Sequence, residues 1–304
     1  MLEIAIMIEG QNGLNWARWQ NIARLVEDAG FVGLYRSDHF TNMNPPDKDS
    51  LELWVSLTWL ASHTKRIEFG SLVSPVSFRH PVLTARMASA VDDLSNGRLT
   101  LGLSAGWQER EHHVFGFDLM DAKPRFDRLE EGLQVITGLL NSDTPLSFDG
   151  KYYQLHEATL LPRPLRPGGP RISIGGNGAH RTPNFVARFA HEWNAMFLPP
   201  DDLKKANRRI DDALKKADRD PKSVRRSMMT GCVFGHDEAS LKQKIEARGR
   251  TADELRQRGI VLGSAGEVKA QLQKLEEAGL QRIMLQWLDL DDLKGLEALA
   301  KAVL

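Results

Sequence analysis

The sequence has little of several features that mark common protein classes. Its 304 residues contain a single cysteine, Cys232, which excludes an internal disulfide framework and a cysteine-based metal cluster. Its 40 basic and 40 acidic side chains balance, which argues against a surface that attracts nucleic acid or an anionic membrane. No apolar run approaches the roughly 20 residues of a membrane span, and the start "MLEIAIMIEG" lacks the basic and long apolar regions of a signal peptide. We therefore expect a cytoplasmic protein without nucleic-acid or membrane partners.

Short apolar runs alternate with amphipathic segments along the whole chain. Apolar runs of this length predict buried strands, and three- and four-residue spacing predicts helices. The expected strands are residues 2–8, 31–36, 66–73, 98–104, 171–176, 193–198, 227–235 and 282–287. The expected helices are residues 16–29, 51–61, 81–94, 124–140, 182–190, 203–217, 267–278 and 291–303. Eight strand–helix units predict a (β/α)8 TIM barrel formed as one domain by residues 1–304.

Two stretches lie outside this alternation and are expected to be loop insertions, at about residues 141–170 and 238–260. The first contains "SFDGKYYQL", which predicts a hairpin. The second is charged and helical, and is compatible both with a lid over the barrel and with a plain solvated helical pair. A doubly wound open sheet is the alternative fold, but it would place G-x-G-x-x-G after the first strand, where this chain has "IEGQNG".

The residues that follow the strands are the candidates for a ligand site, because a barrel of this kind builds its ligand site at the carboxyl ends of its strands. Residues 175–178, "GGNG", precede a helix and predict an anion site, since glycine exposes backbone N–H groups and the helix start adds partial positive charge. Ser104, Ala105 and Gly106 are small enough to leave room for a flat ring, with Trp107 as a wall.

His39 follows Asp38 at the end of the second strand. Imidazole titrates near neutral pH, and a neighbouring carboxylate can orient it, so His39 is the candidate proton carrier. Glu109 and Glu111 could be acids in the barrel mouth, but both precede a charged helix, and a solvated helical face is the expectation for each. The adjacent His112 and His113 point in different directions on a helix and cannot form one metal pair. No metal site is expected, because no histidine, cysteine or carboxylate spacing indicates one.

The same segments resemble the bacterial luciferase-like flavin and deazaflavin oxidoreductases. The resemblance runs from the first residue to the last helix, and is carried by "VEDAGFVGLYRSDHF", "SFRHPVLTARMASAVDDLSNGRLTLGLSAGWQEREHHVFG" and "PRISIGGNGAHRTPNFVARFAHEWN". Within this superfamily the chain is most similar to the branch that uses the deazaflavin coenzyme F420. The resemblance implies an F420-dependent oxidoreductase that transfers a hydride to or from a small organic substrate, and it implies a homodimer. A reduced-FMN-dependent monooxygenase is the alternative enzyme, and a non-catalytic flavin- or deazaflavin-binding protein is the alternative of another class.

The resemblance also implies positions for the cofactor. The tricyclic ring would lie across the barrel mouth beside the catalytic His39, with a non-proline cis peptide near residues 71–73 behind it. The implied cofactor-binding residues are Asp38, Ser71, Leu72, Val73, Ala105, Gly106, Trp107, Gly175, Gly176, Asn177 and Gly178. Sugar-phosphate dehydrogenases of this branch carry an acid where this chain has Trp107 and a tryptophan where it has Met43. Their acid–base pair is therefore not implied here.

Overall fold

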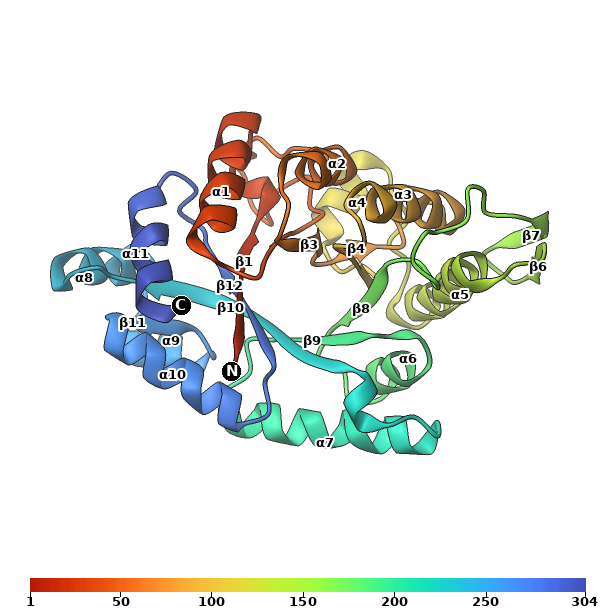
Figure 1. The fold of residues 1–304 in the computed structure, drawn as a ribbon. Helices are drawn as coiled ribbons and strands as arrows, with labels where there is room; N and C mark the ends of the chain where they lie inside the picture. The colour runs from red at the N-terminus through yellow and green to blue at the C-terminus, as the bar shows by residue number, and fades with distance from the viewer.

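The computed structural model describes residues 1–304, which form a closed barrel of eight parallel strands surrounded by helices (Figure 1). The barrel strands are β1 (Glu3–Ile8), β2 (Gly33–Arg36), β3 (Glu68–Ser71), β5 (Leu99–Ser104), β8 (Arg171–Gly175), β9 (Glu192–Met196), β10 (Arg225–Phe234) and β12 (Arg282–Gln286). Each pairs with the next in this order, and β12 pairs with β1. Because the ring closes, the predicted (β/α)8 TIM barrel is confirmed and an open sheet is excluded.

Helices connect the strands on the outside of the barrel. The helices of the eight strand–helix units are α1 (Trp16–Ala29), α2 (Leu53–His63), α3 (Pro81–Leu94), α5 (Ala122–Asn141), α6 (Arg181–Phe189), α7 (Pro200–Lys216), α10 (Ala265–Glu277) and α11 (Leu293–Val303). Their ends follow local sequence signals: α1 begins where the side chain of Asn15 accepts a hydrogen bond from the backbone of Arg18, and ends at Gly30 in a left-handed conformation. No helix has the length and apolar character that crossing a membrane requires.

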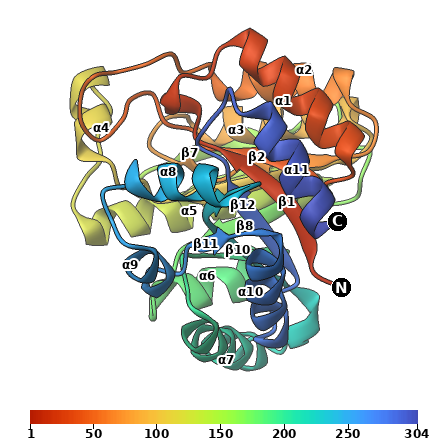
Figure 2. The ribbon, with the colours of Figure 1, turned by 90° about the vertical axis from the view of Figure 1, so that its left-hand side faces the viewer.

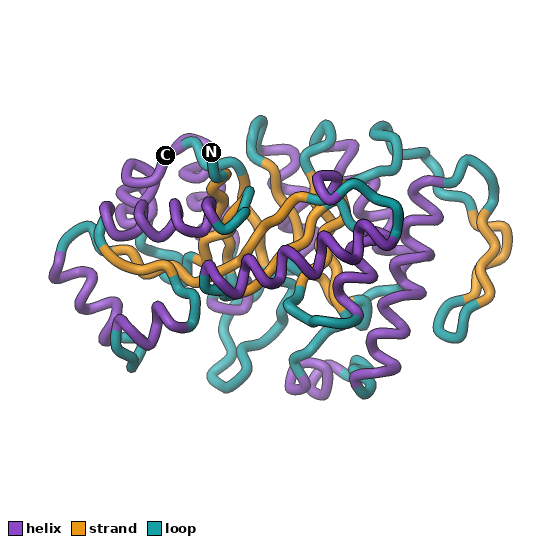
Figure 3. Tube along the Cα trace, turned by 90° about the horizontal axis from the view of Figure 1, so that it is seen from below, coloured by secondary structure: helices purple, strands orange, loops and turns teal.

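Shorter elements lie in the two insertions, near the mouth and just before β10. They are the hairpin strands β6 (Leu146–Asp149) and β7 (Gln154–Ala158), the strands β4 (Ser74–Pro75) and β11 (Val261–Gly263), the helices α4 (Glu109–Phe115), α8 (Glu238–Glu246) and α9 (Ala252–Gln257), and the 3₁₀ turns η1 (Gly10–Asn12) and η2 (Pro221–Ser223). The predicted hairpin is confirmed and projects from the body of the molecule (Figure 3). Strands β4 and β11 were not predicted, since two or three residues are too few to show a periodic pattern.

The barrel has two distinct ends. Figure 2 shows the chain termini at one end and the helices α4 and α9 at the other, which is the end where the strands finish. A large apolar core lies between the strands and the outer helices. Inside the barrel a separate, smaller cluster packs, and it is rich in methionine: Ala5, Met7, Tyr35, Leu72, Met229 and Met284. The mouth of the barrel therefore rests on an apolar layer.

The end where the strands begin, the barrel floor, is closed by an ionic cluster. Arg282 is 1% exposed, and its guanidinium donates to Glu3 and to Glu68, at 2.7 and 2.6 Å respectively. It also donates to the Tyr35 hydroxyl at 2.6 Å. Glu192 is completely buried nearby, and burial raises the pKa of its carboxyl despite the attraction of Arg282. None of these floor residues lines the cavity at the mouth of the barrel.

Candidate active site

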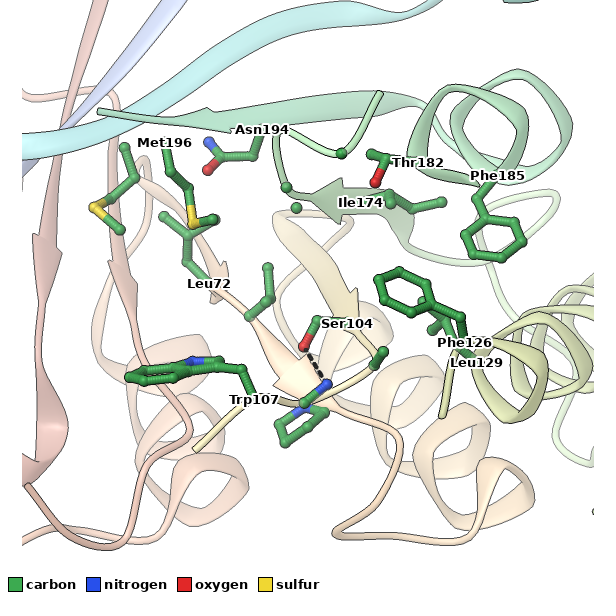
Figure 4. A pocket seen from close by; sticks show the side chains of 18 of the residues that line it. Leu72, Ser104, Trp107, Phe126, Leu129, Ile174, Thr182, Phe185, Asn194 and Met196 are labelled. Atoms are coloured by element: carbon green, nitrogen blue, oxygen red, sulfur yellow. Dashed lines mark hydrogen bonds between the residues drawn. The ribbon is translucent and has the colours of Figure 1, made fainter. Parts of the chain in front are cut away.

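A cavity of about 450 Å³ opens at the carboxyl ends of the strands. Twenty-one residues line it, and the hydrophobic ones are the larger part. Figure 4 shows its two ends: Trp107, Leu72 and Met196 lie toward one, and Thr182, Phe185 and Phe126 toward the other. We call the first the methionine end and the second the phenylalanine end. The cavity is therefore elongated, mostly apolar, and built from loops that follow several different strands.

His39 lies on the wall of this cavity and is held by a buried carboxylate. Its Nδ1 is 2.7 Å from Oε1 of Glu111, on α4, while Oε2 of Glu111 accepts a hydrogen bond from the backbone N–H of Phe40 at 3.0 Å. The imidazole meets the Trp107 ring edge-on, with centroids 5.4 Å apart. Because Nδ1 is engaged, Nε2 is the ring nitrogen that is free to meet a ligand.

The environment of His39 favours its protonated form. Burial lowers its pKa, but the hydrogen bond and the charge of Glu111 raise it, and the net effect is a raised pKa. The sequence analysis expected Glu111 on a solvated face, and this was wrong, since Glu111 is 1% exposed. Glu109, which lies two residues earlier on the same helix, is exposed as expected. The alternative, an acid in the mouth, is therefore correct for Glu111 and not for Glu109, and nothing in the local sequence separates these two glutamates.

Asp38 is buried beneath the cavity wall and does not line it. Its carboxylate pairs with Arg79 and accepts a hydrogen bond from the Ser74 hydroxyl at 2.6 Å. Arg79 continues to Glu52 at 2.7 Å. These contacts fasten the loop after β2 to the segment after β3. Asp38 therefore fixes the position of its neighbour His39, and its carboxylate is not available to a ligand.

The segment after β3 forms another part of the wall through Leu72 and Val73, and a non-proline cis peptide joins these two residues, as the resemblance implied. The side chain of Ser71 points elsewhere: its hydroxyl exchanges hydrogen bonds with the backbone of Gly102 on β5, at 2.8 and 3.0 Å. Ser71 thus joins two barrel strands and does not reach the cavity.

The loop after β8 contributes Gly175, Gly176 and Gly178 to the cavity. Its backbone is fixed from one side by Asn177, whose amide donates to the carbonyl of Met196 and accepts from the N–H of the same residue, at 2.7 and 3.0 Å. A side chain on Gly178 would meet the Thr182 hydroxyl at 2.9 Å. A larger residue would push against Thr182, so glycine at this position keeps the backbone of the loop accessible.

The same loop meets the requirements of an anion site. The backbone N–H groups of residues 177–179 have no acceptor within the protein, and the loop leads directly into the start of α6, where the helix dipole favours negative charge. Thr182 adds a hydroxyl to the wall. A phosphate group fits these donors, and a flat ring fits the apolar cavity beside them.

Nine of the twelve predicted site residues line one cavity, and three do not. Those that line it are His39, Leu72, Val73, Ala105, Gly106, Trp107, Gly175, Gly176 and Gly178. The three that do not line it are Asp38, Ser71 and Asn177. Their side chains form hydrogen bonds within the protein and are not free to contact a cofactor. Lining residues that the sequence analysis did not name include Thr182, Asn194 and Met196.

The fold and the site define a (β/α)8-barrel protein with a mostly apolar ligand cavity at the mouth of the barrel. The chain matches the luciferase-like monooxygenase family over residues 3–249 and belongs to that family. It is similar to an F420-dependent glucose-6-phosphate dehydrogenase of Kineococcus radiotolerans, with 32% identity over 153 residues, which is 50% of this chain and 45% of that protein. It is also similar to a 4-hydroxyprotoasukamycin monooxygenase of Streptomyces nodosus subsp. asukaensis, with 31% identity over 53% of this chain and 42% of that protein. The matched region thus spans less than half the length of these curated relatives.

Among solved structures, the fold is similar to that of an F420-dependent secondary alcohol dehydrogenase in complex with an F420-acetone adduct. The TM-score is 0.87 with 17% identity, over 99% of this chain and 98% of that one. Similarity at this low sequence identity shows that the two proteins share the barrel fold, and it gives no information about a shared reaction. Relatives that use deazaflavin and relatives named as monooxygenases thus occur side by side in the family.

Proposed function

We propose that this protein is an oxidoreductase that uses the deazaflavin F420, and that His39 exchanges the proton that accompanies hydride transfer. When bound, the deazaflavin would supply or accept the hydride. The observation that carries this proposal is that His39, held by Glu111, lines the same cavity as the glycine loop. A small organic substrate would then lie between the imidazole and the ring.

Each part of the cavity has a role in this proposal. The phosphate of the cofactor would meet the N–H groups of residues 177–179 and the Thr182 hydroxyl. Leu72 and Val73 would support the ring, and Ala105 to Trp107 would line its edge. Glu111 would keep Nε2 of His39 directed at the substrate. The apolar wall would exclude water from the reacting atoms.

The cofactor assignment is tested by binding. Purified protein is titrated with F420 and with FMN, each in oxidised and reduced form, and the dissociation constants are measured by fluorescence. Tighter binding of F420 supports the proposal. Tight FMN binding without F420 binding would replace it with a reduced-FMN-dependent monooxygenase, which would then consume oxygen in the presence of reduced FMN.

The catalytic role of His39 is tested by substitution. We expect His39→Ala to bind F420 with nearly unchanged affinity, since the N–H donors of the glycine loop are retained, and to lose about 100-fold or more in hydride transfer. His113→Ala is the matched control, because His113 is exposed on α4. Equal turnover by wild type and His39→Ala would indicate another proton carrier, and no turnover by wild type with any acceptor would indicate a binding protein.

A homodimer and a cytoplasmic location stay predictions that come from the sequence and the family resemblance. Light scattering after size-exclusion chromatography measures the first. Fractionation of cells that express the native chain measures the second.

A further inference from the structure

Asn194 is a polar side chain in an otherwise apolar part of the cavity wall. It lies on β9, is 2% exposed, and lines the cavity together with Ile174, Met196 and Met229. The carboxamide nitrogen has two partners within the protein, whereas the carboxamide oxygen Oδ1 has none. This oxygen is not enclosed by protein atoms either, so it borders the cavity. Because an unpartnered acceptor in a buried position costs free energy, Oδ1 is ready to accept a hydrogen bond from a bound molecule.

A hydrogen-bond chain fixes which way this carboxamide points. Its nitrogen donates to the Ser227 hydroxyl at 2.9 Å and approaches the sulfur of Met284 at 3.4 Å. The Ser227 hydroxyl in turn donates its only proton to the carboxylate of Glu192 at 2.7 Å. Ser227 can therefore only accept from Asn194, and the opposite orientation of the carboxamide would bring two acceptor oxygens together. Figure 4 accordingly shows the oxygen of Asn194 on the side of Leu72 and the nitrogen turned away from it.

The position of Asn194 links the glycine loop to the methionine end. On β9 it pairs with Gly175 of β8, a neighbouring strand about 4.8 Å away, and its backbone carbonyl accepts the N–H of Gly176 at 3.0 Å. Met196 follows on the same strand and lies at the methionine end (Figure 4). A ligand that places a phosphate at residues 177–179 and a ring at the methionine end therefore passes beside Asn194.

The chemistry of a carboxamide oxygen limits what it can bind. It accepts hydrogen bonds and cannot donate them, so it repels the oxygens of a phosphate or a carboxylate and attracts O–H and N–H groups. F420 and FMN carry such groups in two places: the ribitol chain between the phosphate and the ring has hydroxyls, and the ring has an imide N–H. The ribitol chain follows the phosphate directly, so its hydroxyls come first along the path past Asn194.

We propose that Asn194 positions the cofactor: its Oδ1 accepts a hydrogen bond from an O–H or N–H group of the joined ring and ribitol chain, and a ribitol hydroxyl is the expected donor. This inference rests on the proposed function only in requiring a phosphorylated tricyclic cofactor, since F420 and FMN share this unit. With the bond formed, hydrogen bonds run without a break from Glu192 at the barrel floor through Ser227 and Asn194 to the ligand. The chain sets the depth to which the ligand enters the barrel.

Three ligands and one variant test this proposal. The parent ligand is the F420 ring with its ribitol chain; one analogue has a methyl group in place of the ribitol chain, and the other has a methyl group on the imide nitrogen. Dissociation constants are measured by fluorescence for wild type and for Asn194→Leu, which keeps the approximate size of the side chain. We expect the variant to bind the parent and the imide-methylated analogue about 10-fold more weakly than wild type does, and the analogue without ribitol equally well.

The other patterns are equally decisive. A loss seen only with the two ligands that keep the imide N–H identifies the imide as the donor and supports the hydrogen bond. An equal loss for all three ligands would show a steric effect, and no loss for the parent would show that no bond forms; either result overturns the proposal. If F420 does not bind, so that the proposed function fails, riboflavin, lumiflavin and 3-methylriboflavin provide the same comparison on the flavin ring.

Ser227→Ala tests the hydrogen-bond chain itself. Ser227 is completely buried, and the substitution keeps Asn194 but removes the acceptor that orients its carboxamide. We expect the parent ligand to bind about 3-fold more weakly, with unchanged affinity for the analogue without ribitol. Ser173→Ala is the matched control, because Ser173 is buried on the neighbouring β8 and its hydroxyl has no hydrogen-bond partner. Thermal unfolding checks that both variants fold. The same parent affinity in Ser227→Ala and Ser173→Ala would overturn the role of the chain.

Discussion

The pair formed by His39 and Glu111 leads to a prediction about the charge of the imidazole. Glu111→Gln keeps the size of the side chain and an oxygen that can accept from the N–H of Phe40, but it removes the negative charge 2.7 Å from Nδ1 of His39. Without that charge, burial is opposed only by Glu9 and Asp38. The pKa of His39 should therefore fall in the variant.

The magnitude follows from the type of contact. A hydrogen bond between charged groups contributes about 2 kcal/mol when its partners are mostly buried, and the side chains here are 16% and 1% exposed. Since the folded-state pKa of His39 is raised, this contribution is complete below the unfolded-state value of about 6.5 and is lost as pH rises through the folded-state pKa. At pH 5.5 the variant should unfold about 3 °C lower than wild type, and the difference should shrink toward pH 9.

Two measurements check this prediction. Proteins labelled with ¹³C-histidine are titrated by NMR, with His39→Asn identifying the His39 signal among nine, and thermal unfolding is followed at several pH values. Glu109→Gln is the control, because Glu109 is exposed on the same helix and should leave both properties unchanged. A His39 titration that is identical in wild type and Glu111→Gln would refute the assignment of Glu111 as its charge partner.

Three further substitutions have effects that the structure specifies. Gly178→Ala places a methyl group 2.9 Å from the Thr182 hydroxyl, and should weaken F420 binding about 10-fold or more with little loss of stability, as measured by fluorescence titration and thermal unfolding. Gly70→Ala places a methyl group 1.9 Å from the carbonyl oxygen of Thr100 on the neighbouring strand, and should reduce the yield of folded protein severely, as measured by circular dichroism. Arg282→Met leaves three carboxylates at the barrel floor without their main partner, and should cost about 3–5 kcal/mol in chemical denaturation at pH 7.

Each of these results has a contrary outcome that would be informative. Unchanged cofactor affinity in Gly178→Ala would mean that the phosphate does not contact this loop. A stable Gly70→Ala protein would mean that β3 and β5 can separate without loss of the barrel. A smaller loss for Arg282→Met at pH 4 than at pH 7 is expected, because protonated carboxyls need no cation, and a loss independent of pH would contradict the ionic account of the floor.

Most of the fold followed from patterns within single segments. Each of the eight barrel strands is a short apolar run, and helix limits such as Pro81 and Gly30 follow from local backbone preferences. The strands that were missed, β4 and β11, exist only because a neighbouring strand offers hydrogen-bond partners. Their formation depends on tertiary contacts, and no pattern within two or three residues contains that information.

The parts of the candidate site that backbone and small residues form were predictable from the sequence. The contacts between side chains were much less predictable. Glycines and small residues after a strand are visible in the sequence, and they do line the cavity. The side-chain contacts were not visible: Glu111 lies 72 residues from His39, and the neighbours Glu109 and Glu111 look alike until the helix that carries them is docked. The carboxylate of Asp38 pairs with Arg79, a residue 41 positions away, which its place next to His39 in the sequence did not indicate.

The carboxylates at the two ends of the barrel have different partners. At the floor, Arg282 and Arg225 lie within 4 Å of the same three glutamates, so the carboxylates are compensated inside the protein and the cluster serves stability. At the mouth, Glu111 has no arginine or lysine partner, and its charge is compensated by an imidazole that also faces the cavity. A histidine in this position gains and loses its proton beside a fixed negative charge, which suits it to exchange that proton with a molecule bound in the cavity.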